Sequence, residues 1–480
     1  MSTPTRTTAA SPVLAVVVLC LGGLSAALTQ TLVIPIQSEL PQLLGTSASN
    51  AAWVVTITLL AAAVTMPVAG RVADLVGKQR VLVSSAAILL VGSMVCALSS
   101  TLAPMLVGRA LQGLAMGFIP VGISLIREIT PPDLAATATA AMSATLGVGG
   151  AIGLPLSAWI VQAGNWHALF WVATVLAAVI LVSTWFAVPH VRDAQPGRLD
   201  LVGALGLAVG LVSLLVGISK ATVWGWGDPR TLGAIAAGVV VLLLWGAYEL
   251  RQADPLVDLR TTAQRPVLMT NIAAVAIGFG MMAQSIVVPQ LLQLPEATGY
   301  GLGQSILAAG LWMAPAGLMM MLFAPVSSRL IGNLGAKLTL MIGATVLGVG
   351  YLVAFFLMDA PWQLLVASCV SSAGVGIGYA AMPTLILDNA PAREAASAVG
   401  LNALMRSLGT TLAAAIMGTL LTSRTMSLGG FEIPTKGAFQ LCFVAGAVAA
   451  FVGVAIASTI PRRGDSKTLD PAPAVVGAAD

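Results

Sequence analysis

The stretch GRVADLVGKQR, residues 70–80, is charged and bracketed by glycines in a sequence that is otherwise almost uncharged. A long apolar run, 51–69, precedes it, and another, 81–98, follows it. A charged, glycine-flanked segment between two apolar runs is typical of a tight turn that joins two membrane-crossing helices. We therefore expect a short turn over 70–80 and a chain that passes repeatedly through a lipid bilayer.

The composition also indicates a membrane protein. Of the 480 residues, 58% are hydrophobic and 8% are charged, whereas soluble domains carry about 25% charged residues. A chain with a mean hydropathy of +0.96 cannot cover a globule with polar side chains, so the bilayer must act as its solvent. The sequence shows no basic patch for nucleic acid. Its four cysteines lie in apolar runs and it has only two histidines, so we expect neither a metal site nor a bound cofactor.

Apolar runs long enough to span a bilayer, about 20 residues, occur fourteen times. They cover 13–36, 52–70, 81–99, 103–126, 137–162, 167–188, 200–218, 231–249, 267–289, 303–325, 337–357, 361–387, 399–421 and 438–460. The first run has no signal-peptide cleavage pattern, so we interpret it as a retained span. The runs are continuous rather than alternating, which argues against strands. The prediction is an all-α integral membrane protein with about 14 transmembrane helices.

The basic residues predict the orientation of the chain. If the N-terminus is cytoplasmic, 16 of the 22 Lys and Arg residues fall in cytoplasmic segments, four in outer loops and two, Arg109 and Arg406, within spans. Membrane proteins carry such an excess of positive charge on their cytoplasmic side. We therefore predict a multi-pass protein of the cell (plasma) membrane with both termini in the cytoplasm.

The pattern around residues 70–80 recurs once. At an offset of 258 positions three residues match, namely Pro67 with Pro325, Arg71 with Arg329 and Gly77 with Gly335. The offset makes spans 9–14 equivalent to spans 1–6, and repeated halves are typical of secondary transporters. The predicted organisation is a cytoplasmic segment 1–12, a six-helix half 13–188, an inserted helix pair with its loops 189–266, a second six-helix half 267–460 and a disordered cytoplasmic tail 461–480.

Three motifs resemble those of a known family. They lie between spans 2 and 3, in span 4 and in span 5, and read Gly70-x3-Asp74-x2-Gly77-Lys78-x-Arg80, Arg109-x2-Gln112-Gly113 and Gly149-x3-Gly153-Leu154-Pro155. In this order they resemble the motifs of the major facilitator superfamily, and fourteen spans resemble its drug:proton antiporter branch. The third motif departs from the family pattern, because Leu154 separates the glycine from the proline.

The resemblance implies that Asp74 is a gate latch whose partner is the start of span 13. A carboxylate is stabilised at the positive end of a helix dipole, so Asp74 would favour one packing of the two halves. The alternative is an ordinary cytoplasmic loop, in which Arg71, Lys78 and Arg80 serve only to orient the chain.

Charged side chains inside spans are the next candidates. Arg109 is costly in a span unless it faces a polar interior, where it would attract an anion; the alternative is that it snorkels to the outer interface. Gln112 and Gly113 share its helix face. Arg406, one turn after Asn402, is a functional candidate for the same reason, with a structural hydrogen bond as the alternative. The motif in span 5 predicts tight packing and a kink, which ordinary membrane helices also use.

A carboxylate is missing where the family has one. Relatives in the branch carry an Asp in span 1 at the position of Thr29, and no acidic residue lies well inside a predicted span. The candidate proton carriers are therefore Glu128, Asp388 and Glu39, at span ends. A cavity without a carboxylate disfavours cations, so we expect neutral or anionic substrates. The polar candidates for its wall are Thr29, Gln30, Arg109, Gln112, Asn271, Gln284, Asn402 and Arg406.

Together these features predict a monomeric secondary transporter rather than an enzyme. It would export amphiphilic small molecules such as drugs, antibiotics or metabolites by alternating access, driven by a proton gradient. An importer or facilitator of a small metabolite is the alternative. A membrane-embedded enzyme would need a catalytic set at depth and a sensor would normally add a soluble domain, so both are remote alternatives. No Gly-rich nucleotide-binding loop is present.

Overall fold

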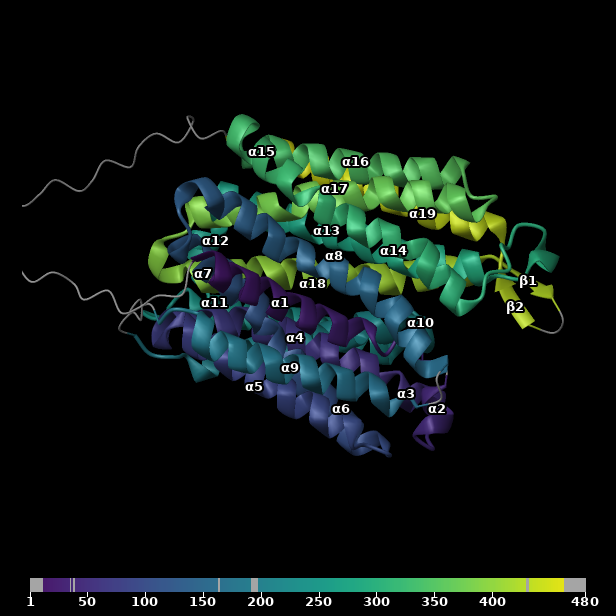
Figure 1. Ribbon diagram of the computed structural model, residues 1–480, viewed down its shortest axis with the longest axis horizontal. Coiled ribbons are helices and arrows are strands. Elements are labelled where there is room, and N and C mark those ends of the chain that lie inside the picture. Colours follow the sequence, from purple (N-terminus) through teal and green to yellow (C-terminus); the bar gives the residue numbers. More distant parts are fainter. Residues whose placement is uncertain are drawn as a thin grey trace, which may run out of the picture.

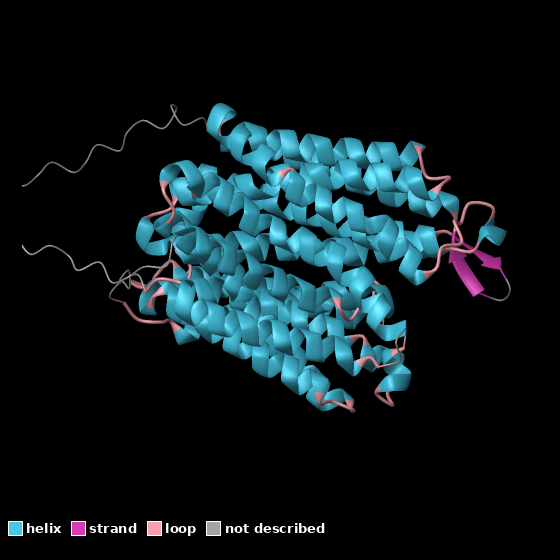
Figure 2. Cartoon of the chain, viewed as in Figure 1, coloured by secondary structure: helices cyan, strands magenta, loops and turns pink. Residues whose placement is uncertain are grey.

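The structure is a computed structural model that describes residues 12–34, 36–37, 39–162, 165–190, 197–428 and 431–461. Over these residues the chain forms a bundle of long helices joined by short connections (Figures 1 and 2). The predicted terminal segments 1–12 and 461–480 lie almost entirely outside the described residues, as does 191–196 of the loop before the inserted pair.

The elements follow one another along the chain without a separate soluble domain in the described part. The first group is α1 (Pro12–Thr31), α2 (Leu40–Leu43), α3 (Ala48–Ala51), α4 (Trp53–Val76), α5 (Lys78–Ala97), α6 (Leu102–Leu114), η1 (Ala115–Gly117), α7 (Phe118–Ile129), α8 (Pro132–Gln162) and α9 (His167–Ala187). The second group is α10 (Leu201–Trp224), α11 (Pro229–Glu249) and the short α12 (Leu259–Ala263). The third group is α13 (Arg265–Gln293), η2 (Glu296–Thr298), α14 (Ile306–Leu322), α15 (Ala324–Leu334), α16 (Ala336–Phe356), α17 (Pro361–Asn389), η3 (Ala392–Glu394), α18 (Ala395–Ser423), β1 (Thr425–Leu428), β2 (Phe431–Pro434) and α19 (Lys436–Ser458).

Fourteen spans of the described chain are long and apolar enough to cross a membrane. This confirms the predicted number of spans and the helical membrane fold. Two spans are interrupted, since η1 lies between α6 and α7 and Phe323 separates α14 from α15. Because the number of crossings is even, the described ends of the chain lie on the same side of the membrane.

The turn at 70–80 is shorter than predicted. α4 continues through Gly70 to Val76, and only Gly77 separates it from α5. The backbone angle φ is +100° at Gly77 and +82° at Gly335, which separates α15 from α16 in the same way. Glycine adopts such angles without steric cost. The prediction of a turn over the whole stretch is wrong, because nothing between Gly70 and Gly77 disrupts a helix and a single internal glycine is tolerated.

Early and late parts of the chain form separate layers of the bundle. In Figure 1 the purple and blue helices α4, α5, α6 and α9 lie on one side and the green helices α15, α16 and α17 on the other. The buried members of the largest apolar cluster all lie within residues 273–460. The two layers meet where α4 packs against α18 and where α8 packs against α14 and α17.

The inserted pair, α10 and α11, lies along the seam between α4 and α18. The two helices pack on each other, and α10 also packs against α4 and α18. Leu211 of α10 shares an apolar cluster with Leu60 of α4 and Leu404 of α18. α10 extends to Trp224, past the predicted end at 218, so Lys220 lies in a span and not in an outer loop. Its ammonium sits 4.7 Å from the ring centroid of Trp53.

One short hairpin lies between the last two predicted spans, where we expected only a connecting loop. β1 pairs with β2 in antiparallel fashion, with Thr425 opposite Pro434. Figure 2 shows the hairpin projecting from the right end of the bundle. Four residues per strand are too few for an alternating pattern to be visible in the sequence, and the hairpin leaves the helical membrane fold unchanged.

Candidate functional site

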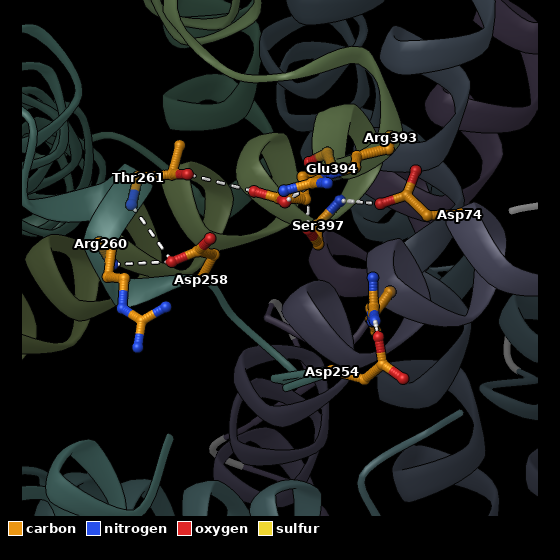
Figure 3. Close-up of polar contacts among 9 residues, drawn as sticks. Asp74, Asp254, Asp258, Arg260, Thr261, Arg393, Glu394 and Ser397 are labelled. Atoms are coloured by element: carbon orange, nitrogen blue, oxygen red, sulfur yellow. Dashed lines mark hydrogen bonds and ion pairs between the residues drawn. The ribbon is translucent and has the colours of Figure 1, made fainter. Parts of the chain in front are cut away.

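Asp74 joins the end of α4 to the beginning of α18. Its side chain is buried, with an exposed fraction of 3%. Oδ1 accepts a hydrogen bond from the backbone N–H of Ala396 at 3.2 Å, and Oδ2 accepts one from the N–H of Ser397 at 3.0 Å (Figure 3). The first N–H groups of a helix have no partner within the helix and form the positive end of its dipole. The carboxylate therefore binds where a negative charge is best stabilised, and we call this arrangement the Asp74 contact.

Two glycines allow the helices to approach closely at the Asp74 contact. A Cβ atom on Gly70 would lie 2.4 Å from the carbonyl oxygen of Ala396, and one on Gly400 would lie 2.3 Å from that of Met66. Each glycine therefore faces the backbone of the other helix. Gly70 lies one turn before Asp74, on the same face of α4, so spacing along the helix places the close approach next to the carboxylate.

Further charged groups surround the Asp74 contact. Arg71 forms an ion pair with Asp254 in the linker between α11 and α12, at 3.9 Å. Glu394, just before α18, accepts hydrogen bonds from Thr261 of α12 at 3.2 Å and from Arg393 at 3.0 Å. Figure 3 shows Asp254, Thr261 and Glu394 near Asp74, on side chains that come from three segments of the chain. The segment after the inserted helix pair is thus bonded both to α4 and to the residue that precedes α18.

A cavity of about 340 Å³ lies at this end of the bundle, which we call the Asp74 end. Its wall is made by the end of α11, the α11–α12 linker, α12, α4 and the start of α18. The polar residues among those that line it are Arg71, Glu249, Gln252, Asp254, Asp258, Arg260, Arg393, Glu394 and Ser397. The described structure therefore places a charged cavity where the sequence suggested only a loop.

Two of the three candidate proton carriers lie in ion pairs. Glu128 pairs with Lys78, and Asp388 of α17 pairs with Arg127 of α7 at 2.6 Å. The second pair connects the early and late layers of the bundle. Glu39 is exposed. Arg80, the last residue of the loop motif, is also exposed, and its Nη1 donates to the carbonyl of Val76 at 3.5 Å.

Arg109 is enclosed in the first layer, with an exposed fraction of 1%. Its Nε donates to the carbonyl oxygen of Val54 and its Nη1 to that of Thr29, both at 3.0 Å. Nη1 also donates to Oε1 of Gln112 at 2.8 Å, and Gln112 in turn donates to Ser93 at 3.0 Å. One guanidinium thus connects the helices of the first four spans through neutral acceptors rather than through a carboxylate.

Neighbouring motif residues serve close packing. A Cβ on Gly113 would lie 2.4 Å from the carbonyl oxygen of Thr58. On α8, a Cβ on Gly149 would lie 2.4 Å from Cβ of Ala27, and one on Gly153 would lie 2.0 Å from Oγ1 of Thr31. Small residues let membrane helices approach in this way. The span 5 motif therefore holds α8 against α1.

The remaining residues of the span 1 and span 5 predictions lie nearby. Thr29 is buried, and its hydroxyl donates to the carbonyl of Ser25 at 2.8 Å, so only its own carbonyl reaches Arg109. Gln30 is half-buried on α1. Pro155 lies inside α8, where a Cβ on Gly310 of α14 would come within 3.5 Å of its nitrogen.

A second polar cluster lies in the late layer and joins α13 to α18. Nδ2 of Asn402 donates to Oδ1 of Asn271 at 2.9 Å, and Nη1 of Arg406 donates to Oδ1 of Asn402 at 2.6 Å. The guanidinium carbon of Arg406 lies 4.5 Å from the ring centroid of Tyr379 on α17. Nε of Arg406 and Nδ2 of Asn271 are buried without a hydrogen-bond acceptor. We call these four residues the Arg406 cluster.

The structure groups the predicted wall residues into these two clusters rather than one. Thr29, Arg109 and Gln112 belong to the first, and Asn271, Asn402 and Arg406 to the second. Gln284 belongs to neither, since its amide donates to the carbonyl of Ser368 at 3.2 Å.

Several participating residues were not singled out in the sequence. Tyr379 had one available signal, because the chain has only four tyrosines and this one falls inside an apolar run. Arg127 and Thr261 gave no comparable signal. Their partners lie 261 and 133 positions away, so no local pattern connects them.

A family model supplies the deciding comparison. The model described as Major Facilitator Superfamily matches residues 19–414 and, again, 270–475. The chain belongs to the major facilitator superfamily. It is therefore a multi-pass membrane transporter and not an enzyme, as the motifs predicted.

Relatives within the superfamily include proteins named as exporters. The chain is 29% identical over 414 residues to the tetracenomycin C resistance and export protein of Streptomyces glaucescens, covering 84% of this chain and 74% of the relative. It is 24% identical over 428 residues to the uncharacterized MFS-type transporter YhcA of Bacillus subtilis (strain 168), covering 88% and 79%. The crystal structure of the human organic anion transporter MFSD10 (TETRAN) has a similar fold, with a TM-score of 0.66 at 15% identity over 93% of this chain and 99% of the other.

Proposed function

We propose that this transporter exports neutral or anionic amphiphilic small molecules, driven by proton entry, and works by alternating access between halves 13–188 and 267–460. The Arg406 cluster carries the substrate proposal. It presents two buried donors, Nε of Arg406 and Nδ2 of Asn271, that have no acceptor. A buried donor without a partner costs about 1–3 kcal/mol, and an acceptor on the substrate would remove that cost.

Charge supports the same substrate class. No described carboxylate forms an ion pair with Arg109 or Arg406, so neither polar cluster offers a negative charge that would compensate a buried cation. The guanidinium of Arg109 already donates hydrogen bonds to two backbone carbonyls and to Gln112. Arg406, whose Nη1 is bonded to Asn402 and whose Nε has no acceptor, is therefore the residue that we assign to substrate anions.

The Asp74 contact supports alternating access. It holds α4 to α18 at one end of the seam, and Arg127 with Asp388 holds α7 to α17. In our proposal this end is cytoplasmic and closed in the present structure, and the export cycle opens it. The efflux direction is the one stated in the name of the Streptomyces glaucescens relative.

Transport by purified protein in liposomes with an imposed pH gradient would test this proposal. An anionic fluorescent amphiphile and a cationic dye of similar size serve as the two probes. We expect gradient-dependent transport of the anion, reduced at least about tenfold by Arg406→Gln because a charge-assisted hydrogen bond contributes about 1.5–3 kcal/mol. The exposed Arg424→Gln is the matched control and should transport normally.

Three results would contradict parts of the proposal. Strong transport of the cation that is independent of Arg109 would reject the substrate class. Transport that persists after the pH gradient is collapsed would reject proton coupling and favour a facilitator. Net uptake from the opposite side would reject export.

A further inference from the structure

The inserted helix pair brings two carboxyl groups together where α10 begins and α11 ends. Asp200 is the N-cap of α10, and its Oδ1 accepts a hydrogen bond from the N–H of Gly203 at 2.8 Å. Glu249 is the last residue of α11, and its Oε2 accepts one from the N–H of Leu256 at 2.9 Å. The side chain of Glu249 is 2% exposed, so this acid is removed from bulk water.

One oxygen on each acid has no hydrogen-bond partner. These oxygens, Oδ2 of Asp200 and Oε1 of Glu249, are both buried. A Cβ atom built on Gly203 would lie 2.7 Å from the first and 2.3 Å from the second, so the two oxygens are no more than about 5 Å apart. Only glycine at position 203 leaves room for both carboxyl groups.

Each of the three cations that line the adjoining cavity has another partner, and Arg198 and Arg251, which flank the two acids in the sequence, are exposed. Arg71 of α4 pairs with Asp254 of the linker, and Arg393 of η3 pairs with Glu394. Arg260 of α12 donates to the carbonyl of Leu250 at 3.0 Å. Over the residues that the structure describes, neither Asp200 nor Glu249 has an ion pair.

The remaining polar neighbours are neutral or acidic. The hydroxyl of Tyr248 donates to Oδ1 of Asp200 at 3.2 Å, and the indole N–H of Trp245 lies beside Glu249 without a hydrogen bond of normal geometry. Asp258 caps α12 through the N–H groups of Arg260 and Thr261. The pair is thus surrounded by groups that do not neutralise two negative charges.

Two ionised carboxylates cannot stay so close in a water-poor site without a cation. A single proton resolves the conflict, because a protonated carboxyl group becomes a donor to the unpartnered oxygen of the other. We propose that Asp200 and Glu249 form a proton-binding site that holds one proton between them. Glu249 lines the cavity at the Asp74 end, so the proton exchanges with the aqueous phase on that side.

The acid pair is connected to the Asp74 contact through the α11–α12 linker and α12. The α11–α12 linker begins directly after Glu249 and continues to Asp254, which pairs with Arg71 three residues before Asp74. Thr261 of α12 bonds to Glu394 at the start of α18. The proposed proton site is therefore linked to the Asp74 contact through the Arg71–Asp254 ion pair and the Thr261–Glu394 hydrogen bond. It lies outside both polar clusters of the bundle.

Infrared spectroscopy of the purified protein in lipid can detect this proton without any transport. We expect a protonated-carboxyl band at neutral pH that Glu249→Gln abolishes, since the amide keeps the shape of the side chain and an acceptor for Leu256. Asp200→Asn should keep the helix cap and shift the pH at which the band disappears downward, because one negative charge is gone. Asp228→Asn, at the matching N-cap of α11, should leave the spectrum unchanged.

The outcomes separate this proposal from the transport proposal. A band that is unchanged in Glu249→Gln, or absent from the wild-type protein at neutral pH, would overturn it. If Asp200→Asn leaves the titration of the band unmoved, the proton belongs to Glu249 alone and the shared site is rejected. Should Glu249→Gln fail to fold, the shift in Asp200→Asn decides the question. None of these results depends on which substrate is exported.

Discussion

The absence of a side chain at Gly70 allows α4 and α18 to meet at Asp74. Gly70 brings its backbone against Ala396, and the hydrogen bonds of Asp74 one turn later require that approach. The carboxylate binds helix N–H groups, which are available only at the helix start. The position of the acid therefore matters as much as its charge, because the free N–H groups lie only in the first turn of α18.

Gly70→Ala should weaken the closed state. The added Cβ would meet a backbone oxygen at 2.4 Å, and overpacking of this kind costs about 1–3 kcal/mol. We expect a lower melting temperature in detergent and a longer distance between spin labels on the Asp74 ends of α4 and α18. Gly332→Ala is the control, because no atom lies within 4 Å of its added Cβ and alanine favours a helix by about 0.5–1 kcal/mol. Equal behaviour of the two variants would contradict the steric argument.

The residue types in the site could be predicted from their rarity in apolar runs, but their partners could not. Arg109, Asn271 and Arg406 are conspicuous because polar side chains are expensive in a bilayer. Whether a guanidinium binds carbonyls, a carboxylate or nothing depends on helices far away in the sequence. Asp200 and Glu249 lie at the ends of the predicted spans 200–218 and 231–249, and only the packing of α10 on α11 shows that they form a pair.

At the scale of elements, helix existence was easier to predict than helix ends. Fourteen apolar runs gave fourteen spans, because length and hydropathy decide which segments enter a bilayer. The end of α4 was misplaced by six residues, from Gly70 to Val76, since charged residues continue a helix as readily as apolar ones. The hairpin β1–β2 carried no signal, because two strands of four residues show no period.

The ion pair between α7 and α17 gives a prediction at this scale. Arg127→Asp should weaken the contact between these helices, and the double variant Arg127→Asp with Asp388→Arg should restore it. The side chains are 39% and 22% exposed, so we expect only about 0.2–1 kcal/mol, less at high salt. Melting temperatures of the four proteins in a double-mutant cycle measure it. A coupling energy indistinguishable from zero at low salt would show that the pair does not hold the helices.

The whole molecule has two seams between its early and late parts, and they are closed by different chemistry. α4 and α18 meet through the charged Asp74 contact. α8 and α15 meet through a hydrogen bond between the hydroxyls of Thr137 and Ser328, at 2.8 Å. A transporter that works by alternating access must separate both seams at the Asp74 end during its cycle.

A disulfide across the second seam should therefore arrest the protein. The two hydroxyl oxygens lie 2.8 Å apart, so the side chains at these positions point toward each other, as a disulfide with Cβ atoms about 3.5–4.5 Å apart requires. In a variant whose four native cysteines are replaced, Thr137→Cys with Ser328→Cys should lose transport on oxidation and regain it on reduction. Each single variant should be insensitive to oxidant. Continued transport by fully cross-linked protein would mean that this end does not open.

The Arg406 cluster has an electrical consequence. Arg406 carries a permanent positive charge that no described carboxylate neutralises. Moving one elementary charge across the whole membrane against a potential of 100 mV takes about 2.3 kcal/mol. Moving it across part of the membrane takes a proportionate part of that energy. A substrate anion seated on Arg406 would cancel that charge. Membrane voltage would then act mainly on the substrate-free transporter. Its return step, which carries the proton in our proposal, would set how the turnover rate responds to voltage.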